Sequence, residues 1–151
     1  MNNKSQQKQD SRYTRTYQVK LYDDIDILIA ENDPVRLIDE VLEGIDYSEL
    51  RRAYSRRGKK PKTRPETMFK VIVYGMSEGV YSKYQIAKKC RRDINYMWLL
   101  NDEPAPSHDA LTWFCSHQLG QTAEGLFYQV VKKLREAGEI QYEHLFVDGT
   151  K

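Results

Sequence analysis

The chain has 151 residues, of which 40% are hydrophobic and 17 are aromatic, so it is long enough for one domain with a buried core. No apolar run approaches the length of a membrane span, and the N-terminus lacks the apolar segment of a secretory signal, which excludes both interpretations. The two cysteines, Cys90 and Cys115, have no metal-ligand spacing and are typical of reduced thiols in a cytoplasmic protein.

The net charge of +2 conceals blocks of opposite sign. Residues 21–50 carry one basic and ten acidic residues, whereas residues 51–92 carry fourteen basic and two acidic residues, a net charge of +12. A block of this kind attracts phosphate backbones, with an affinity that falls as salt rises. The blocks also allow the acidic segment to pair with the basic segment, either within one chain or in a second copy.

Three regions are predicted along the chain. Residues 1–19 are polar and basic, which indicates a disordered tail. Residues 20–139 have the apolar spacing of a compact, mostly α, multi-helix domain. Residues 140–151 are predicted to form one β-strand with its following turn.

The helical region opens with an acidic stretch. Residues 17–30 mix isoleucines with aspartates and predict an extended arm, with room for one short strand. Asp33 followed by Pro34 is typical of a helix start, and Gly44 ends that helix. Asp46 is predicted to cap a second, shorter helix.

A loop with a high density of positive charge comes next. Residues 55–64 read SRRGKKPKTR and contain little that could be buried. The segment is either a loop that grips phosphates or a solvated linker. We favour nucleic-acid contact because further basic residues follow within a short distance: Lys70, Lys83, Lys88, Lys89, Arg91 and Arg92.

Four short helices are predicted in succession between residues 63 and 114, each with its own start signal. Thr63 and Glu66 form a capping box, in which each side chain satisfies a free backbone donor. The caps of the next three helices are Ser82, Asp93 and Ser107. After these helices, Thr122 is predicted to cap a last, longer helix that Gly138 ends.

Residues 81–100 have the length of two helices joined by a tight turn, which is compatible with a helix-turn-helix whose second helix lies in a major groove. The residues expected to anchor the pair in the core are Tyr84, Ile86 and Ala87 in the first helix and Ile94, Met97 and Trp98 in the second. The alternative is that Trp98 and its neighbours only fill the core, and that the basic residues contact only the DNA backbone.

The C-terminal strand ends in a carboxylate. Residues 144–148 are apolar up to Asp148, and Gly149 follows. Asp148 lies at the end of the predicted strand, which is a common position for a metal ligand. Asp-Gly after a strand is equally typical of a hairpin turn. One aspartate cannot hold two metal ions, and a lone strand has no partner, so we expect this end to be the start of a further domain.

Several of these stretches together resemble the N-terminal domain of bacterial insertion-sequence transposases of the InsH type. The resemblance covers residues 20–151 and rests on the order and spacing of loose motifs. They are Arg64-Pro65, Met68, Val73-Tyr74-Gly75, Ser82-Lys83-Tyr84-Gln85-Ile86, Trp98-Leu99, Pro106-Ser107-His108-Asp109-Ala110-Leu111, Phe114, and Phe146-Val147-Asp148-Gly149-Thr150-Lys151.

The resemblance implies a function in DNA transposition. Enzymes of this class use an RNase H-like domain in which two aspartates and a glutamate hold two Mg²⁺ ions for phosphodiester cleavage and strand transfer. Asp148 matches the first of these carboxylates, and the other two have no counterpart before Lys151. We therefore expect this chain alone to bind no cofactor and to be catalytically inactive.

The leading hypothesis is a DNA-binding portion of a DDE transposase that holds double-stranded transposon ends. We assign the DNA contacts to eleven basic residues: Arg51, Arg52, Arg56, Arg57, Lys59, Lys60, Lys62, Lys88, Lys89, Arg91 and Arg92. The alternative is a protein-interaction module, in which the acidic segment forms a homo-oligomer with the basic segment of a second copy, or a truncated product inhibits full-length transposase. Neither hypothesis involves a membrane.

Overall fold

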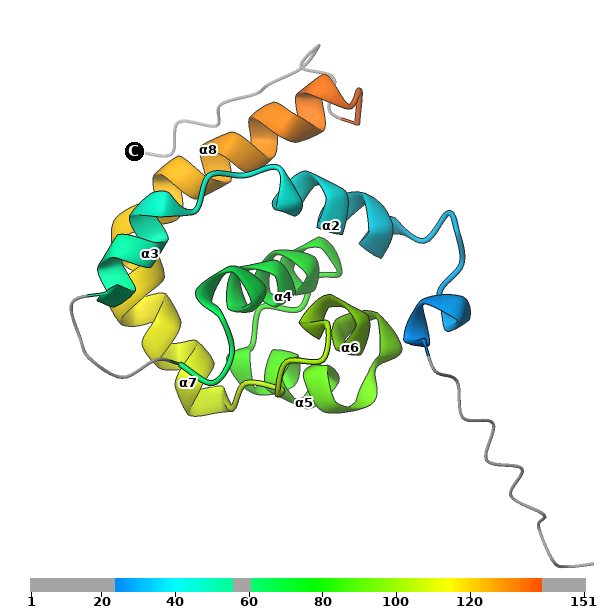
Figure 1. Cartoon of the computed structure of the whole chain (residues 1–151), viewed down its shortest axis with the longest axis horizontal. Coiled ribbons are helices and arrows are strands. Elements are labelled where there is room, and N and C mark those ends of the chain that lie inside the picture. The colour runs from blue at the N-terminus through cyan, green and yellow to red at the C-terminus, as the bar shows by residue number, and fades with distance from the viewer. Residues whose placement is uncertain (1–23, 56–60, 140–151) are drawn as a thin grey trace, which may run out of the picture.

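The computed structural model describes residues 24–55 and 61–139, and the regular structure in these ranges is helical (Figure 1). The mostly α prediction is therefore confirmed there, whereas the disordered tail and the strand predicted at 140–151 lie outside the described residues. The elements are the 3₁₀ helix η1 (Ile25–Leu28), α2 (Pro34–Glu43), α3 (Ser48–Ser55), α4 (Pro65–Ser77), α5 (Lys83–Arg92), α6 (Ile94–Leu100), α7 (His108–Trp113), the π-helical segment η2 (Phe114–Leu119) and α8 (Gly120–Glu136).

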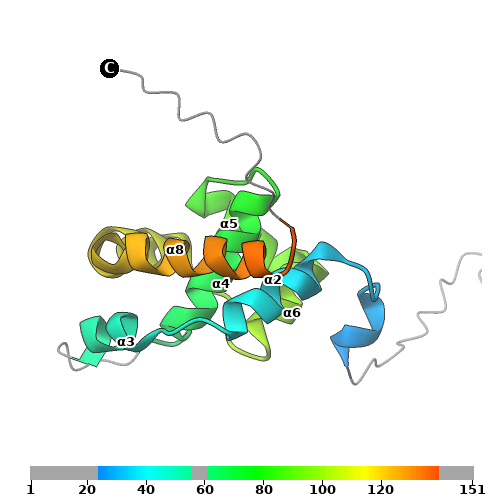
Figure 2. The same cartoon turned by 90° about the horizontal axis from the view of Figure 1, so that it is seen from above.

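Helix α4 is the centre of the fold. It packs against α2, α3, α5 and α6, and most of its length is buried (Figures 1 and 2). Phe69 and Val71 are fully buried, and the ring of Phe69 meets that of Phe127 on α8 edge to face, with 5.4 Å between the ring centroids. A helix that is apolar on nearly all sides can only be stable when other helices surround it. This is the arrangement that α4 adopts.

The turn between α4 and α5 depends on two glycines. Gly79 has a φ of +76°, and the Val80 N–H donates to the Gly75 carbonyl at 2.7 Å, as in a Schellman motif. At Gly75, a Cβ atom would lie 3.0 Å from the Val80 carbonyl oxygen and 3.1 Å from the Ile86 side chain. The absence of a side chain at Gly75 therefore allows α5 to pack closely against α4.

Four of the predicted helix caps are confirmed. Each accepts a hydrogen bond from a backbone N–H in the first turn of its helix, at distances of 2.9, 3.4, 3.0 and 3.1 Å. In chain order they are Asp33, Ser82, Asp93 and Ser107. Asp93 ends α5 as well as beginning α6, so these two helices follow each other with a single residue between them.

The capping box predicted at the start of α4 is wrong. The Thr63 hydroxyl donates instead to the Pro104 carbonyl at 2.7 Å, and Glu66 accepts from Arg51 of α3. The helix begins one residue later than the box requires, with Arg64 at the N-cap and no cap from its own side chain. A carboxylate from the loop after α6 takes this role, because Glu103 accepts from the Arg64 backbone N–H at 2.7 Å.

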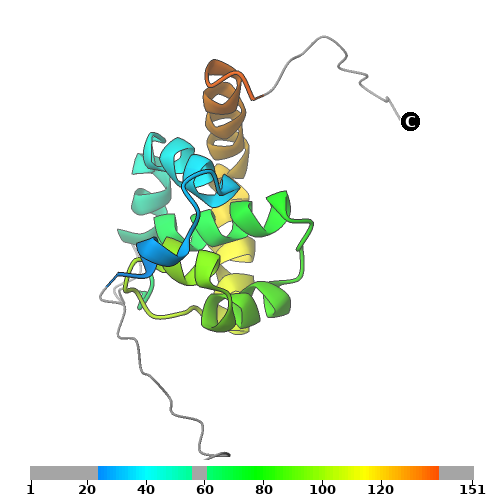
Figure 3. The same ribbon diagram turned by 90° about the vertical axis from the view of Figure 1, so that its right-hand side faces the viewer.

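A further correction concerns the long helix at the C-terminal end. Thr122 does not cap it, because α7, η2 and α8 follow one another without a break from 108 to 136. They form one continuous helical rod, which is seen from the side in Figure 3 and is bent along its length in Figure 1. The Thr122 hydroxyl donates to the Gln118 carbonyl one turn back. The rod ends as expected near Gly138, whose φ of +79° favours glycine. In α8 the buried residues are Thr122, Leu126 and Val130, whereas Val131 is exposed.

The acidic N-terminal stretch packs on the helical body. Residues 25–28 form a 3₁₀ turn, not the short strand that the sequence allowed, because Asp24 caps it by accepting from the Asp26 N–H at 2.9 Å. The Arg36 guanidinium donates to the Asp26 carboxylate at 2.7 Å, and the Trp98 indole N–H donates to the same oxygen at 3.0 Å. These contacts hold the pKa of Asp26 below its ordinary value, with the bond from Arg36 as the largest cause.

Candidate nucleic-acid interface

The predicted DNA-contacting residues fall on two helices that lie on either side of α4 (Figure 2). Arg51 and Arg52 are exposed on α3, and Lys62 is exposed shortly before α4. The second group lies on α5 and consists of Lys88, Lys89, Arg91 and Arg92. Arg56, Arg57, Lys59 and Lys60, together with Asp148, lie outside the described residues.

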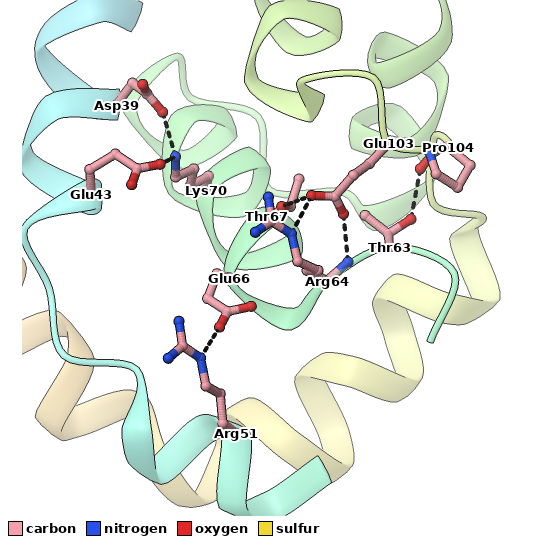
Figure 4. Close-up of polar contacts among 10 residues, drawn as sticks. All are labelled: Asp39, Glu43, Arg51, Thr63, Arg64, Glu66, Thr67, Lys70, Glu103 and Pro104. Atoms are coloured by element: carbon pink, nitrogen blue, oxygen red, sulfur yellow. Dashed lines mark hydrogen bonds and ion pairs between the residues drawn. The ribbon is translucent and has the colours of Figure 1, made fainter. Parts of the chain in front are cut away.

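Several cations of the basic segment form ion pairs within the chain (Figure 4). Arg51 pairs with Glu66, and the Arg64 Nε atom lies 2.7 Å from the Glu103 carboxylate. Lys70, expected to add to the surface charge, is only 8% exposed, and its Nζ atom lies 2.6 Å from the Asp39 carboxylate. Lys70 is therefore a link between α4 and α2 and not part of a phosphate-binding surface.

Helix α5 carries several basic side chains in its last turns. Its inner face buries Ile86, Ala87 and Cys90 against the neighbouring helices. The opposite face carries an exposed tyrosine, two exposed arginines and a half-buried lysine. We call these side chains the α5 face: Tyr84, Lys88, Arg91 and Arg92. Cations in the last turn of a helix also favour its stability, since they lie at the negative end of the helix dipole.

The cations of the α5 face are available for an external partner. Among residues 24–55 and 61–139, Lys88, Arg91 and Arg92 form no ion pair. Lys89 differs from them, since its Nζ atom lies 3.6 Å from the Asp93 carboxylate and 5.5 Å from the centre of the Tyr96 ring. Tyr84, which was expected to anchor the helix, is 60% exposed and belongs to this surface instead.

Helix α6 buries a different face from the predicted one. Ile94 and Met97 are 37% and 40% exposed, whereas Tyr96 and Leu99 are buried. Tyr96 determines this orientation, because its hydroxyl donates to Glu78 at 2.9 Å while its ring packs edge to face on a tyrosine of α4. The helix contains neither lysine nor arginine, so its outer surface does not have the composition of a DNA-reading helix.

A cavity that no sequence motif indicated lies between α3, the start of α4, the 104–107 loop and α7. Its volume is about 610 Å³, and its lining is largely apolar. Two buried polar atoms in this lining, the Tyr54 hydroxyl and Gln118 Oε1, have no hydrogen-bond partner among the described residues. The signal that could have found Gln118 is its position on the buried helical stripe of Leu111 and Phe114, where an apolar residue is expected.

No group of three or more His, Cys, Asp or Glu residues in the described ranges is placed to hold a metal ion. Asp148, the residue assigned to Mg²⁺, lies outside these ranges. Over the same ranges, the helices are too short or too polar to cross a lipid bilayer.

A comparison with known families covers more than half of the chain. Residues 23–117 match the family model described as a transposase domain (DUF772), and the chain therefore belongs to this family. The matched range begins before η1 and ends within η2, so it includes the α5 face and most of the cavity. No curated protein matches the chain, and neither does any solved structure.

Proposed function

We propose that this chain is the DNA-binding N-terminal portion of a DDE transposase of the InsH type, and that it holds double-stranded DNA at the transposon ends. The observation that carries this proposal is the α5 face. Lys88, Arg91 and Arg92 project from one helix with no carboxylate paired to them in the described chain, beside an exposed tyrosine. Such a surface binds phosphates, and an aromatic side chain between cations can contact sugar or base.

In this proposal α5, and not the following helix, faces the DNA. The second helix of the pair offers Ile94 and Met97 to solvent and uses Asn95 internally, where its amide donates to the Tyr74 hydroxyl at 2.8 Å. Contacts from α5 would be mainly to phosphates, which fix the position and orientation of a protein on DNA without reading its sequence. Lys62 and the cations of α3 lie on another side of α4 and would contact a separate stretch of backbone.

The alternative of a dimerisation module has weaker support. It requires free carboxylates on the acidic segment to meet the basic segment of a second copy. The Asp39 and Glu43 carboxylates already pair with Lys70 of the same chain, and Asp26 holds Arg36 and Trp98. Three of the ten carboxylates in residues 21–50 are therefore paired within the chain.

The catalytic part of the proposal concerns a longer protein. If a second aspartate and a glutamate follow in the full-length enzyme, Asp148 would join them in holding Mg²⁺. The role of the described residues would then be to present the DNA end to that centre.

The proposal is tested by neutralising the α5 face. The double variant Arg91→Ala/Arg92→Ala should bind a generic duplex more weakly than wild type, and the difference should be largest at low salt. Each lost phosphate contact makes the slope of log K against log salt shallower by about 0.9, so the ratio of wild-type to variant affinity should be roughly 60 times larger at 0.1 M than at 1 M salt. The matched control is Lys132→Ala/Lys133→Ala, which removes the same charge from exposed positions on α8. Equal losses in both variants, or none in either, would contradict the assignment of DNA contact to α5.

A further inference from the structure

The ring of Tyr84, near the start of α5, is mostly exposed although the helix has an apolar inner face. The inner face is filled by smaller side chains, and Tyr84 projects away from them with 60% of its surface accessible. A second tyrosine, Tyr81, lies three residues earlier, just before the helix cap, and is 66% exposed. Tyrosine is enriched at binding surfaces, because it combines a large apolar ring with a polar tip.

The ring of Tyr84 is supported from α7, which packs beside α5. It meets the ring of His108 edge to face, with 6.4 Å between the ring centroids and 64° between the ring planes. The His108 ring is itself held within α7, because its Nδ1 atom lies 3.2 Å from the Asp109 carboxylate and its Nε2 atom 3.5 Å from the Thr112 hydroxyl. A side chain with only two χ angles and such support loses little conformational freedom when a ligand stacks on it.

The cations of the α5 face continue from this ring along the same side of the helix. Lys88 follows Tyr84 after about one turn and Arg91 after about two turns, which corresponds to about 6 and 10 Å along the helix axis. Neither cation forms an ion pair in residues 24–55 and 61–139. The phosphates of one strand can therefore lie along Lys88 and Arg91 while a base of that strand lies on Tyr84.

We propose that Tyr84 is a stacking platform for an unpaired nucleobase of the DNA that the α5 face holds. This inference rests on the proposed function and specifies the form of DNA that the face prefers. In a duplex, neighbouring bases cover both faces of each base, so a ring on the protein surface can stack only on an unpaired base or on one at a DNA end. Aromatic rings beside cations are the means by which proteins bind single strands, and every base has a π-face, so this site selects unpaired nucleotides and not a sequence.

The test compares one duplex with three different ends: blunt, with a 3′ overhang of three thymidines, and with the same overhang made of three abasic residues. The two overhangs carry the same phosphates, so a difference in affinity between them comes from the bases. The wild-type chain should bind the thymidine overhang roughly tenfold more tightly than the abasic overhang, which is within the range that one stacked base contributes.

Three variants locate this preference. Tyr84→Ala should abolish it, whereas Tyr84→Phe, which retains the ring, should keep it. The matched control is Tyr128→Ala, which removes a similarly exposed ring from α8 and should also keep the preference. Because Tyr84 is mostly exposed, the Tm of Tyr84→Ala should stay close to that of wild type, and its affinity for the abasic overhang should be unchanged.

The possible results separate this inference from the proposed function. Equal affinity of the wild-type chain for the thymidine and abasic overhangs would overturn the stacking site and leave DNA binding by the cations intact. A preference that persists in Tyr84→Ala, or that is lost equally in Tyr128→Ala, would also overturn the site. Absence of binding to all three DNAs would overturn both proposals.

Discussion

The carboxylate of Glu103 joins two parts of the fold that are distant in sequence, and its replacement is the most informative test of the structure. It accepts three hydrogen bonds, from the Arg64 backbone N–H, the Arg64 Nε–H and the Thr67 hydroxyl, each at 2.7 Å. These bonds tie the loop after α6 to the first turn of α4, where backbone donors have no intrahelical partner. Glu103→Gln should therefore weaken the central helix of the domain.

The expected loss follows from the geometry. In Glu103→Gln, one side-chain oxygen remains as an acceptor, and the new amide group must face at least one N–H or O–H that needs an acceptor. The Glu103 side chain is 15% exposed, so water only partly replaces the lost bond. Hydrogen bonds to a charged group contribute about 1.5–3 kcal/mol, and we expect a loss of about 2 kcal/mol in the free energy of unfolding, or roughly 4–8 °C in Tm.

The pH dependence provides a second signature. Burial opposes ionisation of Glu103, but the hydrogen bonds from Arg64 and Thr67 outweigh it and hold the pKa of the carboxyl below its ordinary value of 4.5. A lowered pKa stabilises the folded state above the ordinary pKa, and this contribution disappears as pH falls through the lowered one. The difference between wild type and Glu103→Gln should accordingly be full at pH 7 and shrink below pH 4.5.

Urea unfolding followed by circular dichroism measures both effects. Glu40→Gln is the matched control, because it makes the same change at an exposed position of α2. It should alter the free energy of unfolding by less than about 0.5 kcal/mol. A Glu103→Gln protein as stable as this control at pH 7 would refute the reasoning, because the carboxylate would then not be the cap of α4.

Two further substitutions test the packing around α4 by the same urea unfolding. Gly75→Ala should lower the free energy of unfolding by about 1–3 kcal/mol, because the new Cβ would overlap α5 and the turn before it. The control Gly125→Ala should raise it by about 0.5–1 kcal/mol, because a Cβ at this position meets nothing within 4 Å. Equal effects at the two glycines would contradict the close approach of α5. Lys70→Met should lower the free energy of unfolding by about 1 kcal/mol, because Asp39 loses its partner. The control Lys132→Met should leave the free energy of unfolding unchanged. If Lys70→Met also leaves it unchanged, the ion pair does not stabilise the contact between α2 and α4.

Local signals in the sequence predicted the helices well and their orientation less well. Asp33, Ser82, Asp93 and Ser107 cap their helices as expected, because an N-cap acts on backbone groups two or three residues away. The cap of α4 was missed because Glu103, which provides it, is 39 residues away from Arg64 in the chain. No local pattern contains that information.

The orientation of α6 was missed for a related reason. In a helix as apolar as INYMWLL, periodicity does not indicate which side is buried. The choice is made by polar atoms at the ends of long side chains: the Tyr96 hydroxyl reaches Glu78, and the Trp98 indole reaches Asp26. Both acceptors belong to other elements, so the preference exists only once the domain has folded.

The charge of the basic segment shows why the candidate site could be predicted only in part from the sequence. Counting residues gave a net charge of +12 over 51–92 and predicted an affinity for phosphates, but a count does not distinguish a cation that faces solvent from one that faces a carboxylate. Lys70 and Arg64 are occupied within the chain, by Asp39 and Glu103, whereas Arg91 and Arg92 are not paired in the described residues. Because a phosphate must displace any carboxylate already bound to a cation, the effective binding charge is that of the unpaired residues. On this basis the α5 face and Lys62 should contribute more to the salt dependence of DNA binding by the described domain than the paired cations Lys70 and Arg64.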